Sequence, residues 1–128
     1  MSSRPLVSVV AVVDDDPSIL RSLEYLLESA DYDVRLFTSA AALLSCDCLP
    51  EIGCMISDID MPSMDGFELL TQIHAVRPGL PTIVITGYPE RLKRLPPLEG
   101  INPRVFTKPF QADELLAAVG DALRHVPL

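Results

Sequence analysis

Five polar side chains stand at the ends of short apolar runs that are typical of buried strands. They are Asp14, Asp15, Asp58, Thr86 and Lys108. Carboxylates crowded into one place repel each other unless a cation joins them, and an oxygen-lined site made largely of aspartate suits Mg²⁺. An ammonium group and a hydroxyl can bind phosphoryl oxygens, and a carboxylate can attack phosphorus to form an acyl phosphate. Together these groups predict a site for phosphoryl transfer.

Strand-like and helical stretches alternate along the chain and predict where these side chains lie. Residues 7–13 form a nearly continuous apolar run, typical of a parallel strand buried on both faces. Asp16 and Pro17 then predict a helix N-cap and first helical position, and apolar residues recur at helical spacing to about Ala30. Further strands are expected at 32–37, 54–57, 82–86 and 105–107, and further helices at 40–46, 67–76 and 113–123.

This alternation predicts an α/β fold with a doubly wound, five-stranded parallel sheet of flavodoxin-like architecture. Ligands of such sheets bind at the carboxyl ends of the strands, so the five polar side chains should converge there. The fourth helix is expected to be short or irregular, because residues 88–103 contain four prolines. Each proline inside a helix costs about 3 kcal/mol, which leaves at most a turn or two around residues 90–95.

The length and charge of the chain limit the classes of function it can have. Its 128 residues suit a single domain, expected over 1–128 with its core at about 7–123. A net charge of −8 argues against binding of nucleic acid by this chain. No apolar run approaches the roughly 20 residues that span a bilayer, and none has the features of a signal peptide. We therefore expect a cytoplasmic protein that binds neither nucleic acid nor membrane.

Three cysteines, Cys46, Cys48 and Cys54, lie close together in the sequence. A metal site is disfavoured, because zinc normally needs four ligands and both histidines lie far away in the sequence. The sequence interpretation is that all three are small buried residues, kept reduced in the cytoplasm.

Short motifs around the five polar residues carry a resemblance to a known family. They are Val12-Val13-Asp14-Asp15-Asp16, Ser57-Asp58-Ile59-Asp60-Met61-Pro62, Met64-Asp65-Gly66, Ile85-Thr86-Gly87 and Phe106-Thr107-Lys108-Pro109-Phe110. Asp58 comes 43 residues after Asp15, Thr86 comes 28 residues after Asp58, and Lys108 comes 22 residues after Thr86. In order and spacing the motifs resemble the receiver domains of response regulators (CheY-like and FixJ-like), over about residues 7–123.

The resemblance implies that Asp58 is the phosphoacceptor of a two-component system or phosphorelay. The phosphoryl group would come from a phosphohistidine of a histidine kinase or histidine phosphotransfer protein, which would dock over the Asp58 pocket along the first helix. Mg²⁺, or Mn²⁺ in its place, would bind Asp15, Asp58 and the backbone carbonyl of Asp60, with Asp14 acting through a metal-bound water. Such a domain catalyses its own phosphorylation and dephosphorylation and is not a conventional enzyme.

Further roles follow from the same resemblance. Thr86 would be the switch hydroxyl, Lys108 would bind the phosphoryl group, and the Lys108-Pro109 peptide bond would be cis. Phosphorylation would change a surface that binds an unknown downstream protein, and homodimerisation is possible. Whether the chain stands alone or is a fragment of a longer regulator stays open.

The chain departs from the family on the output side. Receivers usually carry an aromatic residue three before the lysine, and here that residue is Val105. Phe106 should point to the opposite face of its strand and pack in the core. We hypothesise that the signal passes through reordering of residues 87–103 with Tyr88 involved, and that Asp60 and Tyr88 set the lifetime of the phosphorylated state.

Two other functions compete with the phosphoacceptor interpretation. The unusual output side keeps open a pseudo-receiver, a binding module with the receiver fold but without phosphorylation. The Asp58-Ile59-Asp60 segment also has the Asp-x-Asp pattern of haloacid-dehalogenase-type phosphatases. In that family, however, the nucleophile normally follows the first strand, and Asp58 is expected to follow the third.

Overall fold

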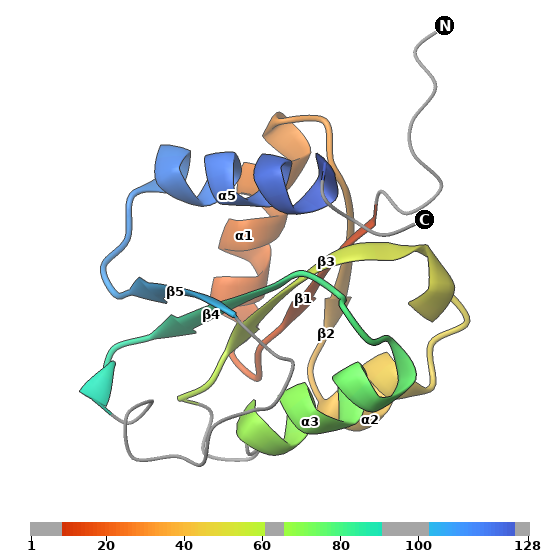
Figure 1. Ribbon diagram of the computed structural model, residues 1–128. Helices are drawn as coiled ribbons and strands as arrows, with labels where there is room; N and C mark the ends of the chain where they lie inside the picture. The colour runs from red at the N-terminus through yellow and green to blue at the C-terminus, as the bar shows by residue number, and fades with distance from the viewer. Residues whose placement is uncertain (1–8, 61–65, 91–102, 125–128) are drawn as a thin grey trace, which may run out of the picture.

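A five-stranded parallel sheet lies between two layers of helices in the computed structural model, which describes residues 9–60, 66–90 and 103–124 (Figure 1). The strand order is β2-β1-β3-β4-β5, and each neighbouring pair is parallel. The strands are β1 (Val9–Val13), β2 (Asp33–Phe37), β3 (Ile52–Asp58), β4 (Thr82–Thr86) and β5 (Arg104–Thr107). The predicted fold class is therefore confirmed.

The helices divide between the two faces of the sheet. Helices α1 (Pro17–Ser29) and α5 (Ala112–Arg124) cover one face, whereas α2 (Ala40–Leu44) and α3 (Gly66–Val76) cover the other (Figure 1). A 3₁₀ turn, η1 (Leu49–Glu51), leads into β3. Within the described residues no helix is both long enough and apolar enough to cross a membrane.

Two helix starts show how local sequence sets the element boundaries. The Asp16 side chain accepts a hydrogen bond of 2.9 Å from the Ser18 N–H, and Pro17 occupies the first position of α1. Ser39 caps α2 in the same manner, by accepting a hydrogen bond of 3.1 Å from the Ala42 N–H. Both caps supply an acceptor to N–H groups that the helix itself leaves unpaired, which confirms the predicted starts.

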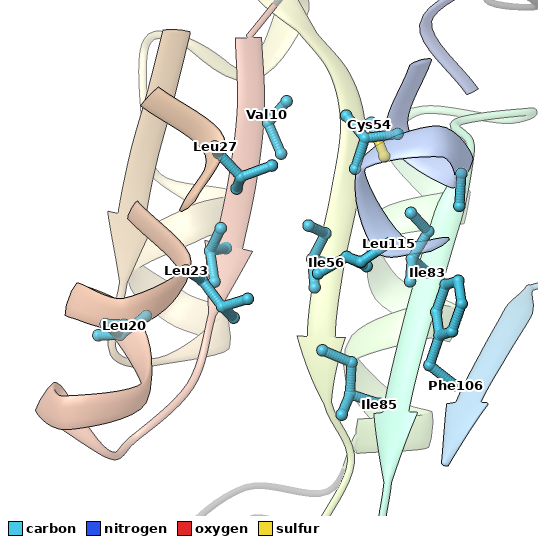
Figure 2. Close-up of a cluster of buried hydrophobic side chains, with 13 residues drawn as sticks. Val10, Leu20, Leu23, Leu27, Cys54, Ile56, Ile83, Ile85, Phe106 and Leu115 are labelled. Atoms are coloured by element: carbon cyan, nitrogen blue, oxygen red, sulfur yellow. The ribbon is translucent and has the colours of Figure 1, made fainter. Parts of the chain in front are cut away.

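Each face of the sheet has its own apolar core, because successive residues of a strand point to opposite faces. The core beneath α1 and α5 is drawn in Figure 2, and its buried members include Val10, Leu23, Leu27, Ile56, Phe106 and Leu115. The core beneath α2 and α3 contains Leu43, Met55, Leu70 and Ile73. The last residues of β3 and β4, Asp58 and Thr86, are accordingly buried.

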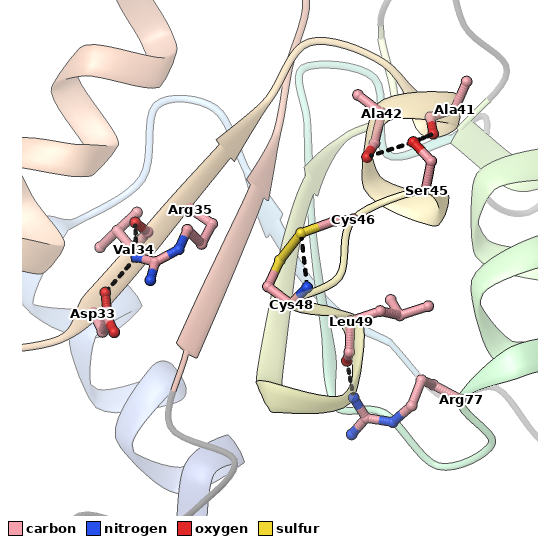
Figure 3. Close-up of a disulfide and its surroundings, with 10 residues drawn as sticks. All are labelled: Asp33, Val34, Arg35, Ala41, Ala42, Ser45, Cys46, Cys48, Leu49 and Arg77. Carbon is pink, nitrogen blue, oxygen red and sulfur yellow. Dashed lines mark hydrogen bonds and ion pairs between the residues drawn. A yellow bond between two sulfur atoms is a disulfide. The ribbon is translucent and has the colours of Figure 1, made fainter.

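The cysteines differ from the sequence interpretation. Cys46 and Cys48 form a disulfide between α2 and η1 (Figure 3), whereas Cys54 is free and buried in β3. The interpretation was wrong for the first two, because the turn brings their Cα atoms to 5.2 Å and neither side chain is fully buried. It was right for Cys54, and burial raises the pKa of that thiol to about 12, so the thiol stays protonated.

The predicted short or irregular fourth helix falls mainly on residues 91–102, which lie outside the described residues. The same is true of most of the segment 87–103 that was expected to reorder. Of this segment, residues 87–90 and Pro103 belong to the described structure.

Candidate functional site

The carboxyl ends of four adjacent strands meet at one edge of the sheet. The register pairs Val13 of β1 with Ser57 of β3, and Asp58 of β3 with Ile85 of β4. Thr86 in turn pairs with Thr107 of β5. The residues that end or follow these strands therefore lie side by side, as the sequence predicts. They are Asp14, Asp15, Asp58, Thr86 and Lys108.

Asp58 and Lys108 form the central contact of the site. The Lys108 Nζ lies 2.5 Å from Asp58 Oδ2, and the Asp58 residue is only 6% exposed. Burial acts to lower the pKa of Lys108, but the hydrogen bond and the charge of Asp58 outweigh it, and the pKa is raised overall. Lys108 therefore keeps its positive charge beside a carboxylate that would otherwise be buried without a counterion.

The backbone around Lys108 holds the ammonium group over Asp58. The Lys108 N–H donates a hydrogen bond of 2.9 Å to the Thr86 carbonyl, which continues the pairing of β4 with β5 by one residue. The following Lys108-Pro109 peptide bond is cis, as predicted. The backbone of Lys108 is thus attached to the end of β4.

Asp14 lies deeper than its neighbours and has one carboxylate oxygen without a donor. Its Oδ1 accepts a hydrogen bond of 2.9 Å from the Asp16 N–H. Its Oδ2 is buried and has no hydrogen-bond partner among the described residues. Burial, with Asp58 nearby, raises the pKa of Asp14 to about 6. A buried carboxylate oxygen without a donor can be satisfied by binding a proton, or by accepting a hydrogen bond from a water molecule that is bound to a cation.

The predicted metal ligands are brought to the same edge. Asp15 is partly buried beside Asp14, and Asp60 lies just beyond Asp58. Across the three described stretches, no group of three or more acidic, histidine or cysteine side chains could hold a metal ion. The predicted arrangement requires only two direct side-chain ligands, because Asp60 would act through its carbonyl and Asp14 through water. The unpartnered oxygen of Asp14 fits such an arrangement.

The carboxylate of Asp60 has a role that sequence reasoning missed. Thr86 Oγ1 donates a hydrogen bond of 2.8 Å to Asp60 Oδ1, and the Gly87 N–H donates one of 2.6 Å to Asp60 Oδ2. The Asp60 N–H donates in turn to Asp58 Oδ1 at 2.7 Å. The signal available in the sequence was an acid two residues after Asp58, close to the end of a strand.

An apolar cleft of about 370 Å³ leads to Asp58 from the side of α1. Its walls come from β1, α1, β3, β4 and the turn after β5, and they include Ile19, Leu23, Ile56, Ile85, Pro109 and Phe110. Asp14, Asp58 and Lys108 form its polar end. The Asp58 carboxylate is therefore approached between the first turns of α1 and residues 108–110.

Residues 105 and 106 adopt the arrangement expected from their spacing. Phe106 is 9% exposed in the core under α1 and α5, with its ring centroid 6.3 Å from that of Phe110. Val105 is 40% exposed, which is consistent with the opposite face of β5. Tyr88 is largely exposed, and its N–H donates a hydrogen bond of 2.9 Å to Thr86 Oγ1. Phe106 thus packs in the core, as predicted.

Comparison with known proteins agrees with this geometry. The profile of the response regulator receiver domain matches residues 10–120, and the chain therefore belongs to the response regulator receiver domain family. A member of this family is not a conventional enzyme, and the haloacid-dehalogenase alternative is wrong. Asp58 also follows the third strand of the chain, as the receiver interpretation requires.

Among its relatives is the transcriptional regulatory protein FixJ of Bradyrhizobium diazoefficiens, 36% identical over 118 residues, which covers 91% of this chain and 57% of FixJ. The response regulator protein TodT of Pseudomonas putida is 33% identical over 127 residues, 99% of this chain and 55% of TodT. The chain thus spans about half the length of these relatives. The crystal structure of a signal receiver domain of an HD domain-containing protein from Pseudomonas fluorescens Pf-5 superimposes with a TM-score of 0.82 at 31% identity, covering 98% of this chain and 93% of that one.

Proposed function

We propose that this receiver domain accepts a phosphoryl group on Asp58 from a phosphohistidine of a histidine kinase or histidine phosphotransfer protein. The observation that carries the proposal is the buried Asp58 carboxylate at the end of β3, paired with Lys108 at 2.5 Å and reached by a cleft. A buried carboxylate that keeps a lysine counterion and an access route is suited to attack an electrophile.

In the proposed reaction an oxygen of Asp58 attacks phosphorus. A new O–P bond forms, the N–P bond to the histidine breaks, and the imidazole leaves with the electron pair and takes up a proton. The ammonium group of Lys108 moves from the carboxylate to a phosphoryl oxygen and neutralises part of its charge. The attack needs no general base, because a carboxylate oxygen is itself the nucleophile.

The proposal includes Mg²⁺ as the cofactor, with Mn²⁺ able to replace it. When bound, the cation would neutralise the phosphoryl oxygens during transfer. Asp15, Asp58 and the backbone carbonyl of Asp60 would hold it, with Asp14 acting through a water molecule. The unpartnered Oδ2 of Asp14 supports this assignment.

The cleft indicates how the donor protein approaches. Its apolar walls on α1 and on the turn after β5 would receive apolar side chains that flank the donor histidine. The proposed setting is the cytoplasm, with a downstream protein as the target of the phosphorylated form. A net charge of −8 disfavours nucleic acid as a target of this chain itself.

Intact-mass measurement after incubation with acetyl phosphate and Mg²⁺ tests the proposal. The wild-type chain should gain the mass of one phosphoryl group, and the isosteric Asp58→Asn variant should gain none. Omission of Mg²⁺ should prevent the gain. If the wild-type chain gains no mass, the proposal is rejected in favour of a pseudo-receiver. The sequence feature that favours a pseudo-receiver is Val105, which replaces the usual aromatic residue.

A further inference from the structure

The Asp60 carboxylate connects the acceptor loop to the end of β4. Its two oxygens bind two different donors, the Thr86 hydroxyl at 2.8 Å and the Gly87 N–H at 2.6 Å. Both are charge-assisted hydrogen bonds, which are stronger than bonds between neutral groups. Thr86 is fully buried, so this contact is poorly accessible to competing water.

We propose that Asp60 is a positioning residue, a resting-state latch that keeps the Thr86 hydroxyl from a phosphoryl group on Asp58. The inference rests on the proposed function, because a latch on Thr86 matters only if Asp58 is phosphorylated. It assigns to the Asp60 side chain a role separate from that of its backbone carbonyl.

The Thr86 hydroxyl already makes all the hydrogen bonds that its single proton allows. A hydroxyl has one proton to donate, and Thr86 donates it to Asp60. Its oxygen already accepts from the Tyr88 N–H at 2.9 Å. Thr86 therefore cannot donate to a phosphoryl oxygen until it gives up its bond to Asp60.

The charge of the incoming phosphoryl group would break the hydrogen bond between Thr86 and Asp60. The Asp60 N–H donates to Asp58 Oδ1 at 2.7 Å, so the latch is bound directly to the acceptor. Phosphorylation would replace the single charge of the Asp58 carboxylate with the charge of about −1.5 to −2 of a phosphoryl group, which would repel the Asp60 carboxylate. The same anion that weakens the latch also offers the Thr86 hydroxyl a new acceptor, so one event drives both changes.

This arrangement also gives the signal a route that needs no aromatic residue at position 105. When Asp60 releases Thr86 it also releases the Gly87 N–H, and Tyr88 is bound to the same hydroxyl. The backbone of residues 87 and 88 would then be released from these contacts. Val105 takes no part in this chain of contacts.

Nuclear magnetic resonance of the full chain without any phosphoryl mimic tests the latch itself. In Asp60→Ala the Gly87 amide proton and the Thr86 methyl group should both shift strongly. In Asp60→Asn the amide oxygen can still accept from Thr86, but the amide nitrogen opposes the Gly87 N–H, so the Gly87 signal should move more than that of Thr86. Glu28→Ala, which removes an exposed charge from the last turn of α1, should move neither.

Binding of beryllofluoride, a phosphoryl mimic, in the presence of Mg²⁺ tests the consequence. Asp60→Ala should bind it about tenfold more tightly than the wild type, because no latch has to be broken. Loss of a negative charge alone would also favour an anion, so the measurement is repeated in a Thr86→Ala background. In that background, Asp60→Ala should raise the affinity for beryllofluoride by about threefold or less, since only the effect of the lost charge remains.

Two results would overturn the latch. One is an unchanged Gly87 amide signal in Asp60→Ala, and the other is an equal gain in beryllofluoride affinity with and without Thr86. Failure of the proposed function is distinguishable, because the wild type would then gain no phosphoryl mass from acetyl phosphate and bind no beryllofluoride. The Gly87 and Thr86 signals would still report the latch in that case.

Discussion

Strands β3 and β5 supply the two ends of the same ion pair from very different surroundings. All seven residues of β3 are buried, and the strand pairs with β1 on one side and β4 on the other. In β5 only Phe106 is buried, and within the described residues the strand pairs only with β4. Asp58 thus lies on the central strand of the sheet, and Lys108 follows a strand at its edge.

This difference suits the proposed chemistry. Asp58 has to keep its position, because in-line attack depends on the placement of its oxygen. Lys108 has to move from the carboxylate to the phosphoryl group, and its side chain is 34% exposed against 7% for Asp58. A rigid acceptor beside a more mobile cation is the arrangement that this division of the sheet provides.

Truncation of the buried strand should have the largest effect on stability. Ile56 is fully buried in β3, so Ile56→Ala should lower the free energy of unfolding by about 2–5 kcal/mol. Denaturant titration followed by circular dichroism measures it. A loss below about 1 kcal/mol would contradict the view that β3 is the rigid half of the pair.

Acidity should change stability through Asp14, which lies beside β3 at the end of β1. Burial raises its pKa from 3.8 to about 6, so the folded state binds the proton more tightly than the unfolded state. The stabilisation from that proton is complete below about pH 4 and is lost as the pH rises through about 6. Metal-free Asp14→Asn, which stays neutral, should therefore be more stable than the wild type at neutral pH, by up to about 3 kcal/mol.

Urea titrations across this pH range, with chelator present, measure the difference between the two proteins. The advantage of Asp14→Asn should shrink toward zero near pH 4, where Asp14 is also neutral. A constant difference from about pH 4 to 8 would show that the Asp14 proton is not linked to folding.

Loss of the disulfide before β3 should have a smaller effect. The bond joins residues only two apart, and closing a loop of about three residues contributes about 1.6 kcal/mol in the chain-entropy description. The Cys46→Ser, Cys48→Ser double variant should therefore lose no more than this, and reductant should lower the wild type to the same level. Reductant should leave the double variant unchanged, and a loss above about 3 kcal/mol would mean that β3 depends on the bond.

The sequence was most informative where burial and polarity change abruptly. Runs buried on both faces are nearly continuous in hydrophobicity, so β1, β3 and β4 were predictable together with the polar residues that end them. The N-cap Asp16 and the cis bond before Pro109 were predictable for similar local reasons, the latter through the family resemblance. The central architecture and the meeting of the five polar side chains at one edge of the sheet followed from these signals.

The missed features depend on contacts across the fold. The 3₁₀ turn η1 and the Cys46–Cys48 disulfide result from the path of the chain between α2 and β3, which has no periodic pattern. The contact between the Asp60 carboxylate and Thr86 joins residues 26 apart through the alignment of β3 with β4. Sequence spacing indicated that Asp60 lies near the site but not which way its carboxylate points.

Substitution at the exposed face of β5 should have the smallest effect. Val105→Thr keeps the shape and β-branching of a side chain that is 40% exposed, so the free energy of unfolding should change by less than about 0.5 kcal/mol. Phosphoryl gain from acetyl phosphate should also be unchanged, because the Lys108 N–H is bound to the Thr86 carbonyl of β4 and not to the side chain of residue 105. Phe106→Ala is the matched control from the buried face of the same strand, with an expected loss of about 3–5 kcal/mol. Slower phosphorylation of Val105→Thr would show that the side chains of β5 set the position of Lys108. Strands β3 and β5 would then differ in their contribution to stability but not in how firmly they hold the site.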